Sequence, residues 1–97
     1  MSYYLDIEKI QIFGNSNYDY SDKAEMVFQI YTRKELLNET DIEIICMDFL
    51  DMNNFRKRIE LDNVSKESPF IFIYGQYLGS YPELVYYHLS NKLITLL

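Results

Sequence analysis

Short apolar runs with strand-like spacing predict three strands in this sequence. An alternating stretch at residues 10–13, bounded by Gly14, predicts a first strand within residues 3–13. Residues 41–50 (DIEIICMDFL) form a near-continuous apolar run, which fits a second strand that is parallel and covered on both faces. Residues 70–73 (FIFI) are β-branched or aromatic and predict a third strand.

Apolar residues at helical spacing predict two helices between these strands. The first runs over about residues 19–37, where Asp19 and Asp22 suit the N-terminal dipole. The second runs over about residues 52–63 and is followed by a link to the third strand. The side chains expected to face the core are Ala24, Val27, Phe28, Tyr31 and Leu36 in the first helix and Met52, Phe55 and Ile59 in the second.

The stretch at residues 68–84 (SPFIFIYGQYLGSYPEL) joins a strand, a turn, a short strand and the start of a helix. Gly75 supplies the positive φ that a tight turn needs, and a short fourth strand follows at residues 77–78. Pro82 suits the first position of a closing helix that covers residues 84–97.

This order of elements and its motifs resemble the glutaredoxin family. In that family the corresponding segment consists of T-V-P, an apolar strand, a turn, I-G-G-C/S-D-D-L and a helix. The residues in register here are Pro69, Ile71, Phe72, Ile73, Gly75, Gly79 and Leu84, followed in the last helix by His88, Lys92, Leu93, Leu96 and Leu97. The resemblance implies one α/β domain over residues 1–97 with a thioredoxin-like fold. Its order would be β-α-β-α-β-β-α, with a four-stranded mixed sheet flanked by helices.

The resemblance also locates an active-site loop that has lost its cysteines. The family's C-P-Y-C corresponds to Tyr18-Asp19-Tyr20-Ser21, so a phenol stands at the position of the nucleophile. Thiol–disulfide exchange needs thiolate attack on sulfur, which a tyrosine cannot perform. Ser21, at the resolving position, is expected to be structural. We therefore expect no enzyme activity at this loop.

The family's glutathione anchors are mostly replaced as well. Its lysine after the first strand corresponds to Asn15, and its C/S-D pair reads Tyr81-Pro82. Pro69 is expected to be cis, as in the family. The positions where a residual glutathione or peptide contact is conceivable are Ser68, Gly79, Ser80 and Glu83. With most charged anchors gone, glutathione binding is not expected, and no cofactor is implied.

Aromatic residues are expected where the family has its thiol and its ligand. If the fold holds, Tyr18, Tyr20 and Tyr81 converge where the thiol would lie, with Phe70 and Tyr77 near the edge. Tyrosine is enriched in binding hot spots, which favours an interface for a protein partner or for a homodimer. The alternative is chance, since the chain has 10 tyrosines in a composition typical of AT-rich genomes.

The single cysteine, Cys46, excludes an internal disulfide and a cysteine-rich metal site. It could be a reactive thiol or an iron–sulfur ligand, but a position in the middle of a strand favours a small buried hydrophobic residue. His88 is expected on the surface. No metal site can be assembled from the remaining residues.

The composition argues against two classes of partner, nucleic acid and membranes. A net charge of −6 and a pI near 4.6 disfavour nucleic acid, and the basic run at residues 56–58 fits a solvated helix face. No apolar run approaches the roughly 18 residues that span a bilayer. The start MSYYLDIEK lacks the features of a signal peptide, so an intracellular, cytoplasmic location is expected, including host cytoplasm or a virion.

The sequence therefore predicts a redox-inactive glutaredoxin-like protein that serves as a protein-binding or structural subunit, with a virus or phage as one possible source. An alternative is a residual glutathione-binding protein or a thiol oxidoreductase that uses Cys46. Homodimerisation through the tyrosines is a third hypothesis.

Overall fold

The computed structural model describes residues 5–58 and 67–97. In chain order its elements are β1 (Ile10–Gly14), α1 (Ser21–Arg33), η1 (Glu39–Asp41), β2 (Ile42–Cys46), α2 (Phe49–Arg58), β3 (Phe70–Ile73), β4 (Gln76–Gly79), α3 (Tyr81–Leu89) and η2 (Leu93–Leu96). The expected order of strands and helices is confirmed within the described residues.

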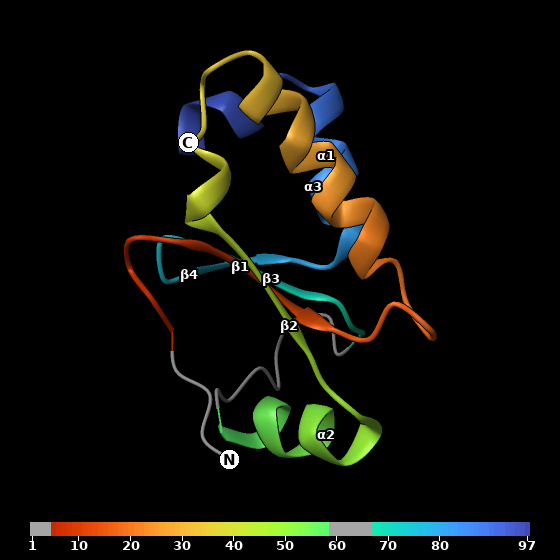
Figure 1. Cartoon of the computed structure of the whole chain (residues 1–97). Coiled ribbons are helices and arrows are strands. Elements are labelled where there is room, and N and C mark those ends of the chain that lie inside the picture. The colour runs from red at the N-terminus through yellow and green to blue at the C-terminus, as the bar shows by residue number, and fades with distance from the viewer. Residues whose placement is uncertain (1–4, 59–66) are drawn as a thin grey trace.

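The strands form one mixed sheet in the order β2-β1-β3-β4. β1 and β2 are parallel, whereas β1–β3 and β3–β4 are antiparallel. In Figure 1, α1 and α3 lie together on one face of this sheet and α2 lies on the other. This is a thioredoxin-like α/β fold, as expected.

Each face of the sheet has its own core. The face toward α1 and α3 is largely aliphatic, and its fully buried members include Ile10, Ile12, Phe28, Ile71, Leu84 and Leu93. The face toward α2 is built from Phe13, Met47, Met52, Phe55, Phe70 and Phe72, which we call the aromatic core. The two sets follow from strand alternation, because neighbouring side chains in β1 and β3 point to opposite faces.

The β3–β4 hairpin is confirmed, and it turns at two residues, Tyr74 and Gly75. Both have positive φ, 52° and 85°, as a two-residue type I′ turn requires. Glycine adopts this conformation freely, whereas Tyr74 does so against its intrinsic preference.

The first helix is shorter than predicted. α1 ends at Arg33 instead of Leu37, because Glu35 adopts a left-handed φ of 61° that the helix cannot continue through. Leu36, expected in the core, is consequently exposed, and Leu37 takes the buried position beneath the helix end.

The second strand is also shorter than predicted, and α2 begins earlier. β2 ends at Cys46, and α2 starts at Phe49, where the Asp48 carboxylate accepts the N–H of Asp51 at 2.7 Å. The expectation of a strand covered on both faces is wrong, because Ile44 and Cys46, which share one face of β2, are both exposed. The predicted end of this helix and Ile59 lie outside the described residues.

The closing helix begins at Tyr81, not at residue 84, with Pro82 in its first turn. It ends at Leu89, and the left-handed φ of 60° at Asn91 separates it from η2. Within residues 5–58 and 67–97, no helix has the length and apolar run that a bilayer crossing requires.

Candidate functional site

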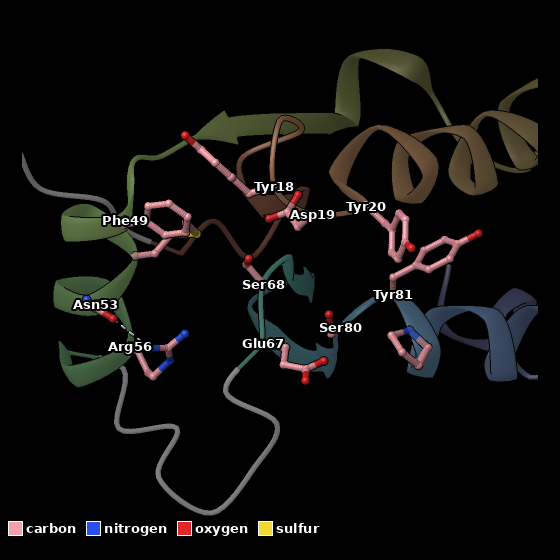
Figure 2. Close-up of a pocket in the computed structure, with 12 residues that line it drawn as sticks. Tyr18, Asp19, Tyr20, Phe49, Asn53, Arg56, Glu67, Ser68, Ser80 and Tyr81 are labelled. Carbon is pink, nitrogen blue, oxygen red and sulfur yellow. Dashed lines mark hydrogen bonds between the residues drawn. The ribbon is translucent and has the colours of Figure 1, made fainter.

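A groove of about 400 Å³ lies where the β1–α1 loop, the start of α2, residues 67–68 and the start of α3 meet. Figure 2 shows these segments facing one another across it. Tyr18, Asp19, Tyr20, Ser68, Ser80 and Tyr81 all line this groove. The fold thus brings together six of the residues that the sequence singled out, from three separate parts of the chain.

Asp19 organises the β1–α1 loop, where the resemblance places a cysteine motif. Its Oδ2 accepts the N–H of Asn15 at 3.0 Å, and its Oδ1 accepts the N–H of Ser21 at 3.0 Å together with the Ser21 hydroxyl. Asp19 therefore satisfies an N–H at the start of α1 that has no partner within the helix. Ser21 is buried, and these bonds give it a structural role.

Gly14 and Pro69 lie directly against this loop. A Cβ on Gly14 would come within 2.6 Å of Asp19 Oδ2 and 3.2 Å of Pro69 Cα. The Ser68–Pro69 peptide bond is cis, as the resemblance implied. The end of β1, the loop and the start of β3 are thus in contact, which fixes the backbone on this side of the groove.

Two aromatic pairs stand on opposite sides of the groove (Figure 2). The Tyr18 and Phe49 rings have centroids 4.4 Å apart at an angle of 45°, and the Tyr20 and Tyr81 rings are 5.3 Å apart at 49°. Tyr18, Tyr20 and Phe49 remain 65%, 54% and 58% exposed. We call these four residues the aromatic walls. The ammonium of Lys23 lies 4.8 Å from the centre of the Tyr20 ring.

Phe49 is a groove residue that the sequence does not reveal, because the apolar run at residues 41–50 places it in the predicted second strand. Asp48 could have revealed it, since a carboxylate at this position is a common start signal for a helix. With Asp48 as the cap, α2 begins at Phe49 and presents this ring to Tyr18.

Arg56 and Glu67 also line the groove, and Figure 2 shows Arg56 beside Asn53 on α2. Arg56 donates to Asn53 Oδ1 at 3.0 Å, and its guanidinium lies 5.4 Å from the centre of the Phe70 ring. The basic run was expected to be a solvated helix face. Lys57 is exposed as expected, but Arg56 is half-buried in the wall of the groove.

The Glu83 carboxylate lies at the start of α3. Its Oε1 accepts the Ser80 N–H at 2.9 Å, so the carboxylate caps α3. Gly79 has a φ of 139° and lies against the Glu83 side chain. Of the four residual-contact candidates, only Ser68 and Ser80 line the groove, and Ser80 is buried.

Phe70 and Tyr77 are not at the edge of the aromatic walls. Phe70 is fully buried, because it points toward α2 and its ring centroid lies 5.6 Å from that of Phe55. Its assignment to an interface is wrong. Tyr77 is half-buried against Phe72. Burial raises the pKa of Tyr77, the Glu83 carboxylate adds to the rise, and the Arg56 guanidinium opposes it.

Cys46 is exposed, contrary to the preferred interpretation as a buried hydrophobic residue. It ends β2, opposite Gly14, and β2 has no further strand on its outer side among the described residues. Cys46 is not among the described residues that line the groove.

The described residues contain no group of three or more His, Cys, Asp or Glu side chains that could hold a metal ion. His88, expected on the surface, is half-buried, and a hydrogen bond of 2.6 Å joins its Nδ1 to the Tyr31 hydroxyl. Burial raises the pKa of Tyr31. This pair connects α1 to α3 and therefore has a structural explanation.

Comparison of the chain with models of protein families and with curated protein sequences gives no match. A function must therefore be argued from the groove and from the motifs of the sequence.

Proposed function

We propose that this chain is a redox-inactive, glutaredoxin-like protein that binds another protein through the groove between the aromatic walls. It would act as a binding or structural subunit in the cytoplasm. The observation that carries the proposal is the composition of the groove. Where the resemblance places a thiol and its ligand, the chain presents Tyr18, Phe49, Tyr20 and Tyr81.

Loss of redox chemistry is supported by the loop itself. Tyr18 occupies the nucleophile's position, and a phenol does not form a mixed disulfide. The Ser21 hydroxyl is buried and donates to Asp19, so it offers no replacement. The only thiol, Cys46, lies at the end of the edge strand and outside the groove lining.

Binding of a protein is supported by the exposed aromatic surface. Three of the four wall residues expose more than half of their side chains, although burying an aromatic ring is strongly favourable in water. Exposed aromatic clusters bordered by polar groups are typical of interaction sites. Because Asp19 already accepts hydrogen bonds from Asn15 and Ser21 within the loop, the entropic cost of ordering this loop when a partner binds is reduced.

Glutathione is a poorer fit to the same groove. The γ-glutamyl end of the tripeptide carries an ammonium that needs a carboxylate, and the Glu83 carboxylate already caps α3. Ser68 keeps a backbone for contact, but a single contact without charged anchors gives little affinity.

The test is a quantitative pulldown from the source cells, with the wild type compared with the double variant Tyr18→Ala/Tyr81→Ala. Tyr86→Ala is the matched control, because Tyr86 is 56% exposed on α3 and does not line the groove. We expect a partner that the wild type and Tyr86→Ala retain and the double variant loses. Equal recovery by all three proteins would refute the interface.

A second assay tests the redox claim. We expect no turnover above buffer in mixed-disulfide reduction with glutathione. Turnover that Cys46→Ser abolishes would contradict the proposal and would establish a thiol oxidoreductase that uses Cys46.

A further inference from the structure

A second groove, of about 600 Å³, lies against α1 and the start of α3. Figure 1 shows these two helices side by side on one face of the sheet. The α1 residues that line this groove recur three or four positions apart, so they form one stripe along the helix. They include Lys23, Met26, Val27, Ile30 and Arg33, and Tyr81 adds to the lining from α3. We call this surface the α1 groove.

The middle of the α1 groove is apolar and is anchored to the core. Val27, Ile30 and Tyr81 are partly buried and pack against the core that α1 and α3 cover. Val27, expected to face the core, therefore also contributes to a surface. Met26 is 67% exposed, and methionine is flexible and polarisable enough to adapt to the shape of a partner. The α1 groove thus combines a firm apolar floor with one adaptable side chain.

Two cations stand at the two ends of this apolar stripe. Lys23 and Arg33 are both exposed and lie in the first and last turns of α1, about 15 Å apart along the helix axis. Neither forms an ion pair with another residue in the described part of the chain. No aspartate or glutamate is among the described residues that line the α1 groove. In a chain with a net charge of −6, this stripe is therefore a local site of positive charge.

The contact of Lys23 with an aromatic ring leaves it able to bind an anion. Its ammonium lies 4.8 Å from the centre of the Tyr20 ring. An ammonium carries three N–H donors, and the exposed side chain of Lys23 keeps donors available to a partner. The ring holds the charge near the α1 groove without neutralising it.

These features define the chemistry of an occupant. The apolar floor favours apolar side chains, and the two cations favour a carboxylate at each end. The single carboxylate of a fatty acid would reach only one of the two cations. A peptide helix rises about 1.5 Å per residue, so two acidic residues about ten positions apart match the separation of the cations. Amphipathic helices bind apolar grooves through residues spaced three and four positions apart, which is also the spacing on α1.

We propose that the α1 groove binds an acidic amphipathic helix of a partner protein. The apolar residues of this helix pack on Met26, Val27 and Ile30. Two of its carboxylates, about ten positions apart, pair with Lys23 and Arg33. This inference goes beyond the proposed function, because among the described lining residues the two grooves share only Tyr81, whose hydroxyl points away from the groove between the aromatic walls (Figure 2).

The experiment is a titration of the full chain with a capped peptide of about 15 residues, followed by backbone amide NMR. The peptide has an alanine and glutamine background, which favours a helix at this length, and three leucines on one face. Two glutamates about ten positions apart flank the leucines. The control peptide carries glutamine in place of both glutamates. We expect shifts confined to residues 22–34 and 80–82, and binding of the control peptide that is weaker by at least about fivefold.

Variants of the chain test the cations and the floor separately. Lys23→Gln and Arg33→Gln should each weaken binding by about two- to fivefold, as expected for one exposed ion pair. Met26→Gln should weaken binding about fivefold, because it removes an exposed apolar contact. Lys57→Gln is the matched control and should change binding by less than about twofold, because Lys57 is exposed on α2 and does not line the α1 groove. The dispersion of each amide spectrum shows that the variant is folded.

Several outcomes would overturn the inference. They are silence at millimolar peptide, equal binding of the two peptides, and shifts that persist unchanged in the double variant Lys23→Gln/Arg33→Gln. Tighter binding of dodecanoate than of the glutamate peptide would assign the α1 groove to a fatty acid instead. A dimer in sedimentation that the double variant dissociates would assign it to a second copy of this chain.

The proposed function and this inference can fail separately. Tyr18 lines the groove between the aromatic walls and not the α1 groove, whereas Lys23 and Arg33 line the α1 groove and not the other. A partner that Tyr18→Ala loses and Lys23→Gln/Arg33→Gln retains supports the proposed function. The peptide titration decides this inference whichever result the pulldown gives.

Discussion

Gly14 is expected to be the most sensitive position near the groove. An added Cβ would lie 2.6 Å from Asp19 Oδ2 and closer still to Ser21 Oγ. Neither group can yield easily, because the Ser21 hydroxyl donates to Asp19 and Asp19 also accepts from the Asn15 N–H. Gly14→Ala must therefore displace the loop or break these bonds.

The expected change in the free energy of unfolding combines two costs and one opposing gain. Overpacking costs about 1–3 kcal/mol, and the loss of one hydrogen bond to a carboxylate costs about 1.5–3 kcal/mol. The reduced entropy of the unfolded chain returns about 0.4–1 kcal/mol. The net destabilisation of Gly14→Ala is then about 3 kcal/mol, a large share of the stability of a small domain.

Urea unfolding followed by circular dichroism measures this change. With a slope of about 2 kcal/mol per molar urea, the midpoint should fall by about 1.5 M. The decisive control is Gly14→Ala made in a Ser21→Ala background, which removes the closest obstructing atom and should recover at least about 1 kcal/mol. A destabilisation below about 0.5 kcal/mol, or an equal cost in both backgrounds, would refute the reasoning.

Three further predictions concern the cores and the thiol. Phe55→Ala should cost about 3–5 kcal/mol in the same urea assay, because this buried ring stacks on Phe13 at 4.4 Å; a cost below about 1 kcal/mol would contradict its role in the aromatic core. Burial raises the pKa of Tyr31, so the folded state keeps this proton to higher pH than the unfolded chain does. The stability that the neutral, buried Tyr31 phenol gives the folded state is complete below about pH 10 and is lost as the pH rises through the folded pKa. Tyr31→Phe should therefore lose less stability than the wild type between about pH 9 and about pH 11. Cys46 should react with a thiol reagent in the native state, and Cys46→Ser should change the free energy of unfolding by less than about 0.5 kcal/mol; a thiol that reacts only after unfolding would contradict its exposure.

The elements that the sequence predicts well depend on local chemistry. Strand alternation, the glycine of the hairpin and Pro82 in the first turn of α3 each act within a few residues. The ends of α1 and α3 are set instead by left-handed backbone at Glu35 and Asn91. Glutamate rarely adopts that conformation, so its type gives no indication of where α1 stops.

The candidate site was predictable only where the resemblance supplied long-range information. It brought Tyr18, Tyr20 and Tyr81 to one place, and all three line the groove. Whether a residue is covered depends on neighbours far apart in the chain. Cys46 is exposed at the end of β2, and Phe70 is buried because its side chain packs against Phe55 of α2. Spacing within one strand cannot reveal either fact.

The aromatic walls belong to opposite layers of the fold, and this has a consequence for motion. Phe49 stands on α2, whereas Tyr20 and Tyr81 stand at the starts of α1 and α3 on the other face of the sheet. A segment held between them would brace the two layers together, and binding to the folded form alone opposes local opening. The amides of α2 should then exchange with deuterium more slowly in the complex, even at residues that the bound segment never touches.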